Sequence, residues 1–195
     1  MEQLLKLARQ TGFSQAAVLE MSSLHALAEV REMCAADRCH QYGTSWSCPP
    51  ACGTLEQCQQ RMEHYRQGIL VQTTGELADD FDLKAIQAIE VRHKQSFFTL
   101  TRQIRLLYAD CLPLTAGTCT LCRTCTYPDK PCRFPKKRFS SMEAYGLLVS
   151  DICTKSGLRY YYGPQTMTYT ACILLNERKG RDSEWQHPKR YFSSY

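Results

Sequence analysis

The longest regular pattern in the chain is the proline-free stretch Ile86-Gln-Ala-Ile-Glu-Val-Arg-His-Lys-Gln-Ser-Phe-Phe-Thr-Leu-Thr-Arg-Gln-Ile-Arg-Leu-Leu107. Its apolar residues recur at intervals of three and four, as on the buried face of an amphipathic helix. They are Ile86, Ile89, Phe97, Leu100, Ile104 and Leu107. The stretch therefore predicts a long helix. His93 lies on the same face, and we expect a core histidine there rather than a metal ligand.

Shorter elements are expected on both sides of this helix. Strands are predicted at residues 16–20, 69–74, 112–116, 158–162 and 166–175, where apolar, β-branched and aromatic residues cluster. Helices are predicted from the N-terminus to Gly12 and at residues 24–36, 54–66 and 142–155. This alternation predicts an α/β or α+β fold, with a small mixed sheet, flanking helices and two irregular cysteine-rich metal loops. We expect one α/β metal-binding domain over residues 1–175, with cysteine clusters at 34–58 and 119–132, and a polar, basic tail over residues 176–195.

The composition limits which roles the cysteines can have. Twelve of the 195 residues are cysteine, which is below the roughly 8–10% typical of small secreted disulfide-bonded proteins. The N-terminus has no basic stretch followed by an apolar one, so no secretion signal is expected. No apolar run is long enough to span a membrane. We therefore expect a cytoplasmic protein, in which thiols stay reduced and are metal ligands or redox groups.

The second cysteine cluster has the sharper spacing. It reads Cys119-Thr-Leu-Cys122-Arg-Thr-Cys125 and then Cys132-Arg-Phe-Pro135, which is C-x2-C-x2-C-x6-C. Bacterial ferredoxins hold a [4Fe–4S] cluster with C-x2-C-x2-C-x3-C-P, so the match is partial because the last gap here is longer. A zinc ion usually takes two cysteine pairs from separate hairpins. The spacing favours [4Fe–4S] over zinc, with zinc and a purely redox or structural thiol group as alternatives.

The first cluster matches no standard metal motif. Its cysteines are Cys34, Cys39, Cys48, Cys52 and Cys58. A metal site needs four ligands, so one of the five is in excess. The spacing makes Cys52 the weakest candidate and leaves it as an alternate ligand. The predicted ligands are Cys34, Cys39, Cys48 and Cys58. The remaining three cysteines, Cys111, Cys153 and Cys172, stand alone among apolar neighbours and are expected to be buried thiols.

The positive charge is concentrated at the second cluster. The chain carries a formal net charge of +5. Within residues 119–138 the only acidic residue is Asp129, and the basic residues are Arg123, Lys130, Arg133, Lys136, Lys137 and Arg138. A basic run can bind nucleic acid. Because four cysteines share this stretch, we expect the basic residues to offset the negative charge of a thiolate-bound cluster instead.

Polar residues after the second cluster are candidates for contacts near the metal. They are Arg133, Ser141, Glu143 and Tyr145. The alternative is a capped helix, in which Ser141 is the N-cap and Glu143 lies in the positive first turn. The chain has no Gly-rich phosphate loop, no G-x-S-x-G and no H-E-x-x-H. The sequence therefore leaves open whether the protein is an enzyme.

These motifs together resemble a known family. The pattern is Cys34…Cys39-x2-Tyr-Gly-x2-Trp-x-Cys48-Pro-Pro…Cys58, then Cys119-x2-Cys122-x2-Cys125…Pro-Cys132-Arg-x-Pro135…Ser141-Met-Glu-Ala-Tyr-Gly146. From about Val18 to Leu175 it is similar to uncharacterised, cysteine-rich predicted metal-binding proteins of bacteria and archaea. Their pattern usually has a small apolar residue at Cys52 and a proline at Ser140. The resemblance implies metal binding, with iron–sulfur chemistry expected, and no established reaction.

Three functions follow as hypotheses. The first is an iron–sulfur protein with two [4Fe–4S] clusters that exchanges electrons with a redox partner protein. A crossed pairing, in which one cysteine binds the other cluster as in two-cluster ferredoxins, is an alternative arrangement of the same ligands. The second is a non-redox, zinc-binding structural module whose basic loop and tail bind a partner or nucleic acid. The third is an iron–sulfur enzyme that binds its substrate at an open iron position near Arg133 and Glu143.

Overall fold

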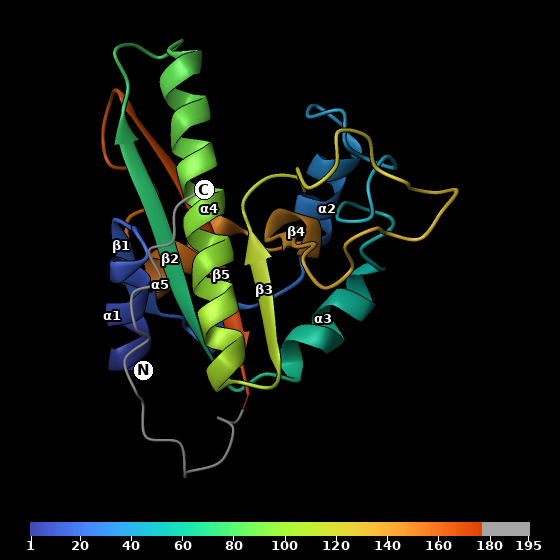
Figure 1. Cartoon of the computed structure of the whole chain (residues 1–195), viewed down its shortest axis with the longest axis horizontal. Coiled ribbons are helices and arrows are strands. Elements are labelled where there is room, and N and C mark those ends of the chain that lie inside the picture. The colour runs from blue at the N-terminus through green and yellow to red at the C-terminus, as the bar shows by residue number, and fades with distance from the viewer. Residues whose placement is uncertain (177–195) are drawn as a thin grey trace, which may run out of the picture.

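A five-stranded mixed sheet with the strand order β1-β2-β5-β3-β4 forms the centre of the fold (Figure 1). Its strands are β1 Gln15–Val18, β2 Gln67–Glu76, β3 Cys111–Thr115, β4 Ser140–Ser141 and β5 Thr166–Leu175. All neighbours are antiparallel except β3 and β4, which run parallel. The computed structural model describes residues 1–176. Nearly all of the tail predicted at 176–195 therefore lies outside the described residues.

The two longest strands, β2 and β5, are buried on both faces. Leu70 pairs with Cys172 and Val71 with Ala171 along their ladder. All four of these residues are fully buried. Strands covered on both sides consist of continuous apolar runs, which is why Ile69–Val71 and Ala171–Leu175 show no polar alternation. The predictions of strands here are confirmed.

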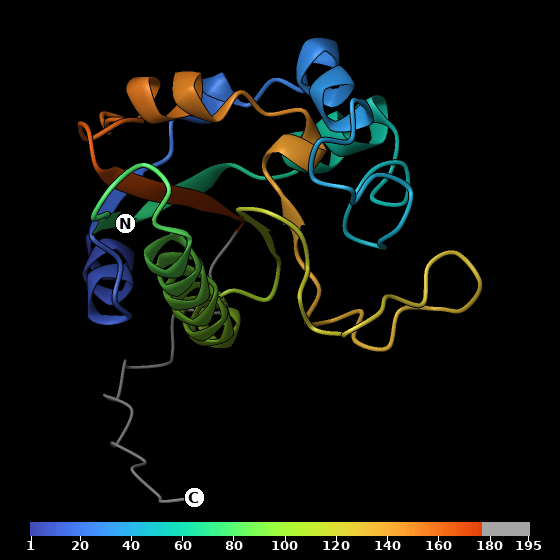
Figure 2. The same cartoon turned by 90° about the horizontal axis from the view of Figure 1, so that it is seen from above.

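Each face of the sheet carries its own hydrophobic core. Helices α1 (Glu2–Gln10) and α4 (Leu83–Leu107) pack on one face. Helices α3 (Leu55–Glu63) and α5 (Val149–Lys155) pack on the other. Figure 2 shows α1 and α4 together below the sheet and α5 above it. The fold class expected from the sequence, a small mixed sheet with flanking helices, is confirmed.

Helix α4 confirms the longest pattern in the sequence. It begins after the N-cap Asp82, whose carboxylate accepts a hydrogen bond from the Ala85 backbone N–H at 3.0 Å. His93 is fully buried on its inner face, as expected. Its Nδ1 lies 3.0 Å from Thr73 Oγ1, and its ring contacts Phe13 edge-on. Burial, with a smaller contribution from Lys94, lowers the pKa of His93 to about 4, so the imidazole is neutral.

The predicted helix at 142–155 is wrong in its first half. The chain forms a short 3₁₀ turn, η2 (Glu143–Tyr145), and then α5 begins only at Val149. Gly146 separates them in the left-handed region, with φ of 78°. Its carbonyl accepts a hydrogen bond from Leu27 N–H at 2.8 Å. Here a tertiary contact overrides the local helical pattern.

Two other predicted elements differ from the structure. Helix α2 spans only Ala28–Ala35, because residues 24–27 form no helix after the 3₁₀ turn at Met21–Ser23 and Leu27, the N-cap, is extended. The strand predicted at 158–162 is irregular, and Tyr160 and Tyr161 are exposed. The side chain of the buried Gln72 fixes this segment instead. It donates to Arg159 O at 2.8 Å and accepts from the Tyr162 hydroxyl at 2.8 Å.

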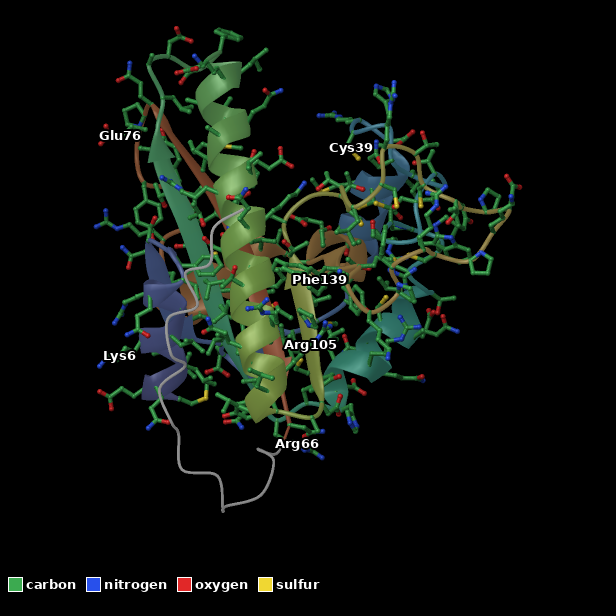
Figure 3. The ribbon with its side chains drawn as sticks, viewed as in Figure 1. Lys6, Cys39, Arg66, Glu76, Arg105 and Phe139 are labelled. Carbon is green, nitrogen blue, oxygen red and sulfur yellow. The ribbon has the colours of Figure 1, made fainter. Side chains whose placement is uncertain are left out.

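Both cysteine-rich loops lie at the same end of the molecule (Figures 1 and 2). Residues 116–139 leave β3 and return to β4 without forming a helix or strand. Arg105 of α4 holds the returning end: its Nη1 donates to Lys136 O at 2.7 Å and its guanidinium lies 5.6 Å from the centre of the Phe139 ring (Figure 3). Within residues 1–176 no helix has the length and apolar character needed to cross a membrane.

Candidate metal centre

The four cysteines of the second loop line one cavity of about 470 Å³. They are Cys119, Cys122, Cys125 and Cys132. Three arginines, Arg123, Arg133 and Arg138, also line it, as does His40 from the first loop. The structure thus brings together the predicted ligands of this cluster and half of the basic residues expected to offset their charge.

Hydrogen bonds inside the loop bring Cys132 close to the other three cysteines of this cavity, although six residues separate it from Cys125. Lys130 N–H donates to Thr126 O at 2.9 Å, and the Thr126 hydroxyl donates to Pro131 O at 3.0 Å. Arg133 Nη1 donates to Thr124 O at 2.9 Å. These bonds close residues 124–133 into an ordered turn. The six residues between the last two cysteines therefore fold back instead of separating them.

The electrostatics of this cavity favour a bound cation. At Cys125, burial raises the pKa, but hydrogen bonds from the Trp46 and Tyr127 backbone and the Ser45 hydroxyl outweigh it, so the pKa is lowered. At Cys119, burial raises the pKa, and the charges of Cys132, Cys122 and Cys125 raise it further. Several thiolates crowded together repel one another, and a metal cation removes that repulsion.

Three cysteines of the first loop line another cavity, of about 400 Å³. We name this one the first cavity and that of the second loop the second cavity. They are Cys34, just inside the end of α2, Cys39 and Cys48. Figure 3 places Cys39 at the top of the cysteine-rich side, away from α4. Burial and the nearby Glu143 charge raise the pKa of Cys34, and Arg31 opposes them.

The two cavities are neighbours. Gln41 and Thr118 line both of them. The Thr118 hydroxyl lies 3.4 Å from Cys48 Sγ and 3.4 Å from Gln41 Oε1. Cys119 N–H donates to Ser47 Oγ at 3.3 Å, which joins the two loops at this wall. One shared wall of two side chains therefore separates the two sets of cysteines.

Cys58, predicted as the fourth ligand of the first cluster, lies outside both cavities. It is fully buried in the first half of α3, and Arg31 Nη2 donates to its Sγ at 3.4 Å. Cys52 lies against it, and Cys52 Sγ also lies 3.4 Å from Ala144 O. A hydrogen bond from Cys52, opposed by burial and aided by Arg31, lowers the pKa of Cys58 to about 7. The sequence grouped Cys58 with the loop cysteines, whereas the structure pairs it with Cys52.

The predicted polar contacts divide between the cavities. Arg133 lines the second cavity, and Ser141 and Glu143 line the first. Ser141 Oγ also accepts from Ala144 N–H at 3.0 Å, a bond of the kind that the capping alternative predicted, although the residues after it form a 3₁₀ turn whose N-cap position is Met142. Glu143 is exposed where it lines the first cavity, and desolvation by the neighbouring protein atoms raises the pKa of its carboxyl. Tyr145 is buried away from both cavities, beside Arg61.

Sequence reasoning missed two arginines beneath the first loop. Arg31 Nη1 donates to Gly53 O at 2.9 Å, and Arg61 Nη1 donates to Cys52 O at 2.7 Å. Arg61 follows Cys58 by three residues on α3, a spacing that places both side chains on one face. That spacing was a usable signal. Arg31 comes from α2, and no local pattern connects it with Cys58.

The three isolated cysteines lie outside both cavities. Cys153 and Cys172 are fully buried, as expected, and Cys111 is partly buried. Burial raises the pKa of all three thiols, although Arg105 opposes it at Cys111 and hydrogen bonds from Thr170 and Gln72 oppose it at Cys153. They are therefore protonated packing residues rather than ligands.

The spacing of the thiols bears on what the second cavity could hold. Among residues 1–176, no three Cys, His, Asp or Glu side chains gather closely enough to hold one metal ion. A tetrahedral zinc site needs sulfurs about 2.3 Å from the metal and so about 3.8 Å from one another. A [4Fe–4S] cubane binds one thiolate at each of its four irons and spaces the sulfurs more widely. Four thiols line the second cavity, which equals the number of thiolates that a cubane takes.

One comparison with known proteins gives a match. Residues 17–175 match the model of a family described as predicted metal-binding protein (DUF2284). No curated protein matches the chain, and no solved structure matches it. The match covers both cysteine loops and every strand except the first two residues of β1.

Proposed function

We propose, since the chain belongs to this family of predicted metal-binding proteins, that it is an iron–sulfur protein with two [4Fe–4S] clusters that passes electrons to or from a partner enzyme. The observation that carries the proposal is the pair of cysteine-lined cavities with Gln41 and Thr118 as their common wall. Two adjacent metal centres in one small fold suit an electron relay, because each electron has only a short distance to cross.

The second cavity supplies a complete set of thiolate ligands. Cys119, Cys122, Cys125 and Cys132 would hold one cluster, and Arg123, Arg133 and Arg138 would offset its charge. When bound, the cluster supplies one-electron redox chemistry. Positive side chains next to such a cluster favour its reduced form and raise its potential.

The first cavity supplies three thiolates, from Cys34, Cys39 and Cys48. The sequence predicts Cys58 as the fourth ligand, but it would have to leave Arg31 and Cys52 to reach this cavity. We therefore leave Cys58 out of the proposed set. Loss of metal from a Cys58→Ser variant would restore it.

Metal analysis of protein purified without oxygen tests the proposal. We expect brown protein with about eight irons and eight sulfides per chain. Cys122→Ala should lose about half of the iron, whereas Cys111→Ala, which removes a thiol outside both cavities, should keep all of it. Colourless protein with about two zinc ions per chain would instead support the zinc-binding module.

A second candidate function is supported by the three-cysteine cavity. Ser141 and Glu143 line it beside only three thiols, so a cluster bound there would have one iron without a cysteine. An enzyme could bind its substrate at that iron, with the Ser141 hydroxyl and the Glu143 carboxyl as polar contacts. In that case Glu143→Gln should alter the EPR signal of the reduced protein without changing its iron content. An electron carrier would show the same signal in both proteins.

A further inference from the structure

The basic residues of the second loop fall into two groups. The three arginines line the second cavity, whereas the three lysines line neither cavity. The lysines are Lys130, Lys136 and Lys137, and all three are exposed. Within residues 1–176 their ammonium groups have no hydrogen-bond or ion-pair partner. Compensation of the thiolate charge therefore accounts for the arginines and leaves the lysines without a role in the metal site.

The backbone that carries these lysines is ordered and short. Lys130 N–H donates to Thr126 O at 2.9 Å, and Arg105 of α4 donates to Lys136 O at 2.7 Å. Residues 130–137 span at most about 25 Å even when fully extended. Weak electron-transfer complexes bury less than about 1,200 Å² in total, and the half of that area on one protein is a patch of similar width. One docked partner can therefore contact all three lysines.

Two exposed apolar side chains lie in the same loop. Phe134 is 40% exposed and Leu121 is 39% exposed. Both line the second cavity. Apolar residues near the centre with charged residues around them are the usual arrangement of a protein interface. Figures 1 and 2 show this loop projecting from the sheet on the side opposite α1, where a partner can approach it.

The charge of the loop selects the kind of partner. Asp129 is the only acidic residue among residues 119–138, so the partner surface must be acidic. Planar recognition of phosphate groups favours arginine, but the arginines here line the cavity, and Arg133 also donates to Thr124 O. Lysine is a compact, hydrated charge on a flexible stem. Such charges suit the brief, salt-sensitive contacts of a protein that must leave again after each electron.

We propose that Lys130, Lys136 and Lys137, with Phe134 and Leu121, form the docking surface for an acidic electron-carrier protein. Carboxylates of the carrier face the three lysines, and its redox centre lies over the second cavity, because the two apolar residues belong to both the surface and the cavity wall. The class of partner rests on the proposed function, whereas the surface itself is the same whichever metal the cavities bind. Electrostatic attraction to this surface speeds association and weakens with salt.

Zero-length cross-linking tests where the carrier docks, because a carbodiimide joins a lysine amine to a carboxylate in contact with it. The metal-loaded full chain is mixed without oxygen with a two-cluster ferredoxin of strongly negative net charge, cross-linked at low salt and mapped by mass spectrometry. We expect the links at Lys130, Lys136 and Lys137. They should be lost at about 0.5 M salt, where the Debye length falls to about 4 Å.

A pair of charge-matched variants tests what the surface does. The first variant replaces the three lysines of the surface with glutamine. The control replaces three exposed lysines outside the loop with glutamine, and these are Lys6, Lys84 and Lys155. Both variants lose the same charge and should keep their metal content. At low salt the second-order rate of electron exchange with the ferredoxin should fall by about tenfold or more in the first variant and by much less in the control.

Three results would overturn the docking surface. The first is cross-linking at Lys6, Lys84 and Lys155 as often as at the lysines of the loop. The second is an equal rate of electron exchange in the two variants. The third is cross-linking of the loop to residues 76–82 of a second copy, or binding of a short single-stranded RNA, in place of the ferredoxin.

The proposed function fails in a different way. A protein that contains zinc, or one that exchanges no electrons, would still form cross-links through the lysines of the loop if the surface is correct. An iron-containing protein that exchanges electrons equally well in both variants would keep the proposed function and refute the surface. Metal analysis and cross-linking together therefore distinguish the two failures.

Discussion

The Trp46 indole Nε1 donates a hydrogen bond to the carbonyl oxygen of Lys130 at 3.0 Å. This bond joins the two cysteine-rich loops at a point 84 residues apart in the chain. The indole also meets the Tyr127 ring edge-on, with centroids 5.0 Å apart. Trp46 belongs to the first loop, yet its contacts lie between Cys125 and Cys132. The two proposed sites therefore share their supporting structure.

Trp46→Phe should loosen the second loop. The substitution keeps an aromatic ring near Tyr127 but removes the hydrogen bond, which contributes about 1 kcal/mol. We expect faster metal loss to a chelator and faster amide hydrogen exchange in residues 119–138, with little change in the sheet. Tyr161→Phe, at an exposed tyrosine outside the loops, is the matched control. Equal chelator rates in both variants would show that the Trp46 contact does not support the site.

His93 should make stability depend on pH. Its pKa is about 4 in the folded protein and about 6.5 when unfolded, so the unfolded chain binds more protons in between. The free energy of unfolding should therefore fall as the pH drops from about 6.5 to about 4, by up to about 3 kcal/mol. Urea titrations of metal-free wild type and His93→Gln across this range measure the difference. If both lose stability equally, His93 is not the group responsible.

Gly146→Ala should destabilise the turn that carries the first-cavity residues. An added Cβ would lie 2.7 Å from Leu55 Cδ1 and 3.1 Å from the Leu27 backbone, at a φ of +78°. Gly157 has a similar φ of +75° with nothing within 4 Å of its Cβ position. Gly157→Ala should therefore lower the free energy of unfolding by about 1–2 kcal/mol, for the left-handed conformation alone. Gly146→Ala should lower it by more. Equal denaturation midpoints for the two variants would contradict the close packing of Gly146.

Arg133 should tune the second site through its charge. Arg133→Gln removes a positive charge from the cavity wall, so we expect a lower reduction potential at an unchanged iron content. Arg133→Lys keeps the charge but loses the guanidinium Nη1 that donates to Thr124 O, so its potential should stay closer to that of the wild type. Electrochemical titration of both variants measures this. A potential in Arg133→Gln that equals the wild-type value would show that the guanidinium does not act on the metal centre.

The elements that the sequence predicted best are those whose signal is local and long. Helix α4 carries its apolar stripe over several turns, and β5 is a continuous run of strand-forming residues. The helix predicted at 142–155 has a local helical pattern too, but contacts of Gly146 with Leu27 and Leu55, distant in sequence, interrupt it. No window of sequence around Gly146 contains that information.

Some residues of the candidate site could likewise be placed from the sequence, and others could not. Short spacings identified Cys119, Cys122 and Cys125, because ligands two residues apart must share a loop. Cys58 could not be placed by spacing, since its position depends on which face of α3 meets Arg31 from another helix. The common wall of Gln41 and Thr118 was equally hidden, because its residues come from different loops.

The parallel pairing of β3 and β4 has a mechanical consequence. Neighbouring parallel strands need a long connection, usually a helix that is stable in its own right. Here the connection is the irregular segment 116–139 with four cysteines, and it fixes where Ser140 and Ser141 join the sheet edge. Filling and emptying of the second cavity would thus be transmitted along the chain to Glu143 at the first. The crossover therefore couples the geometry of the second cavity to the edge of the sheet and, through Ser141, to the wall of the first cavity.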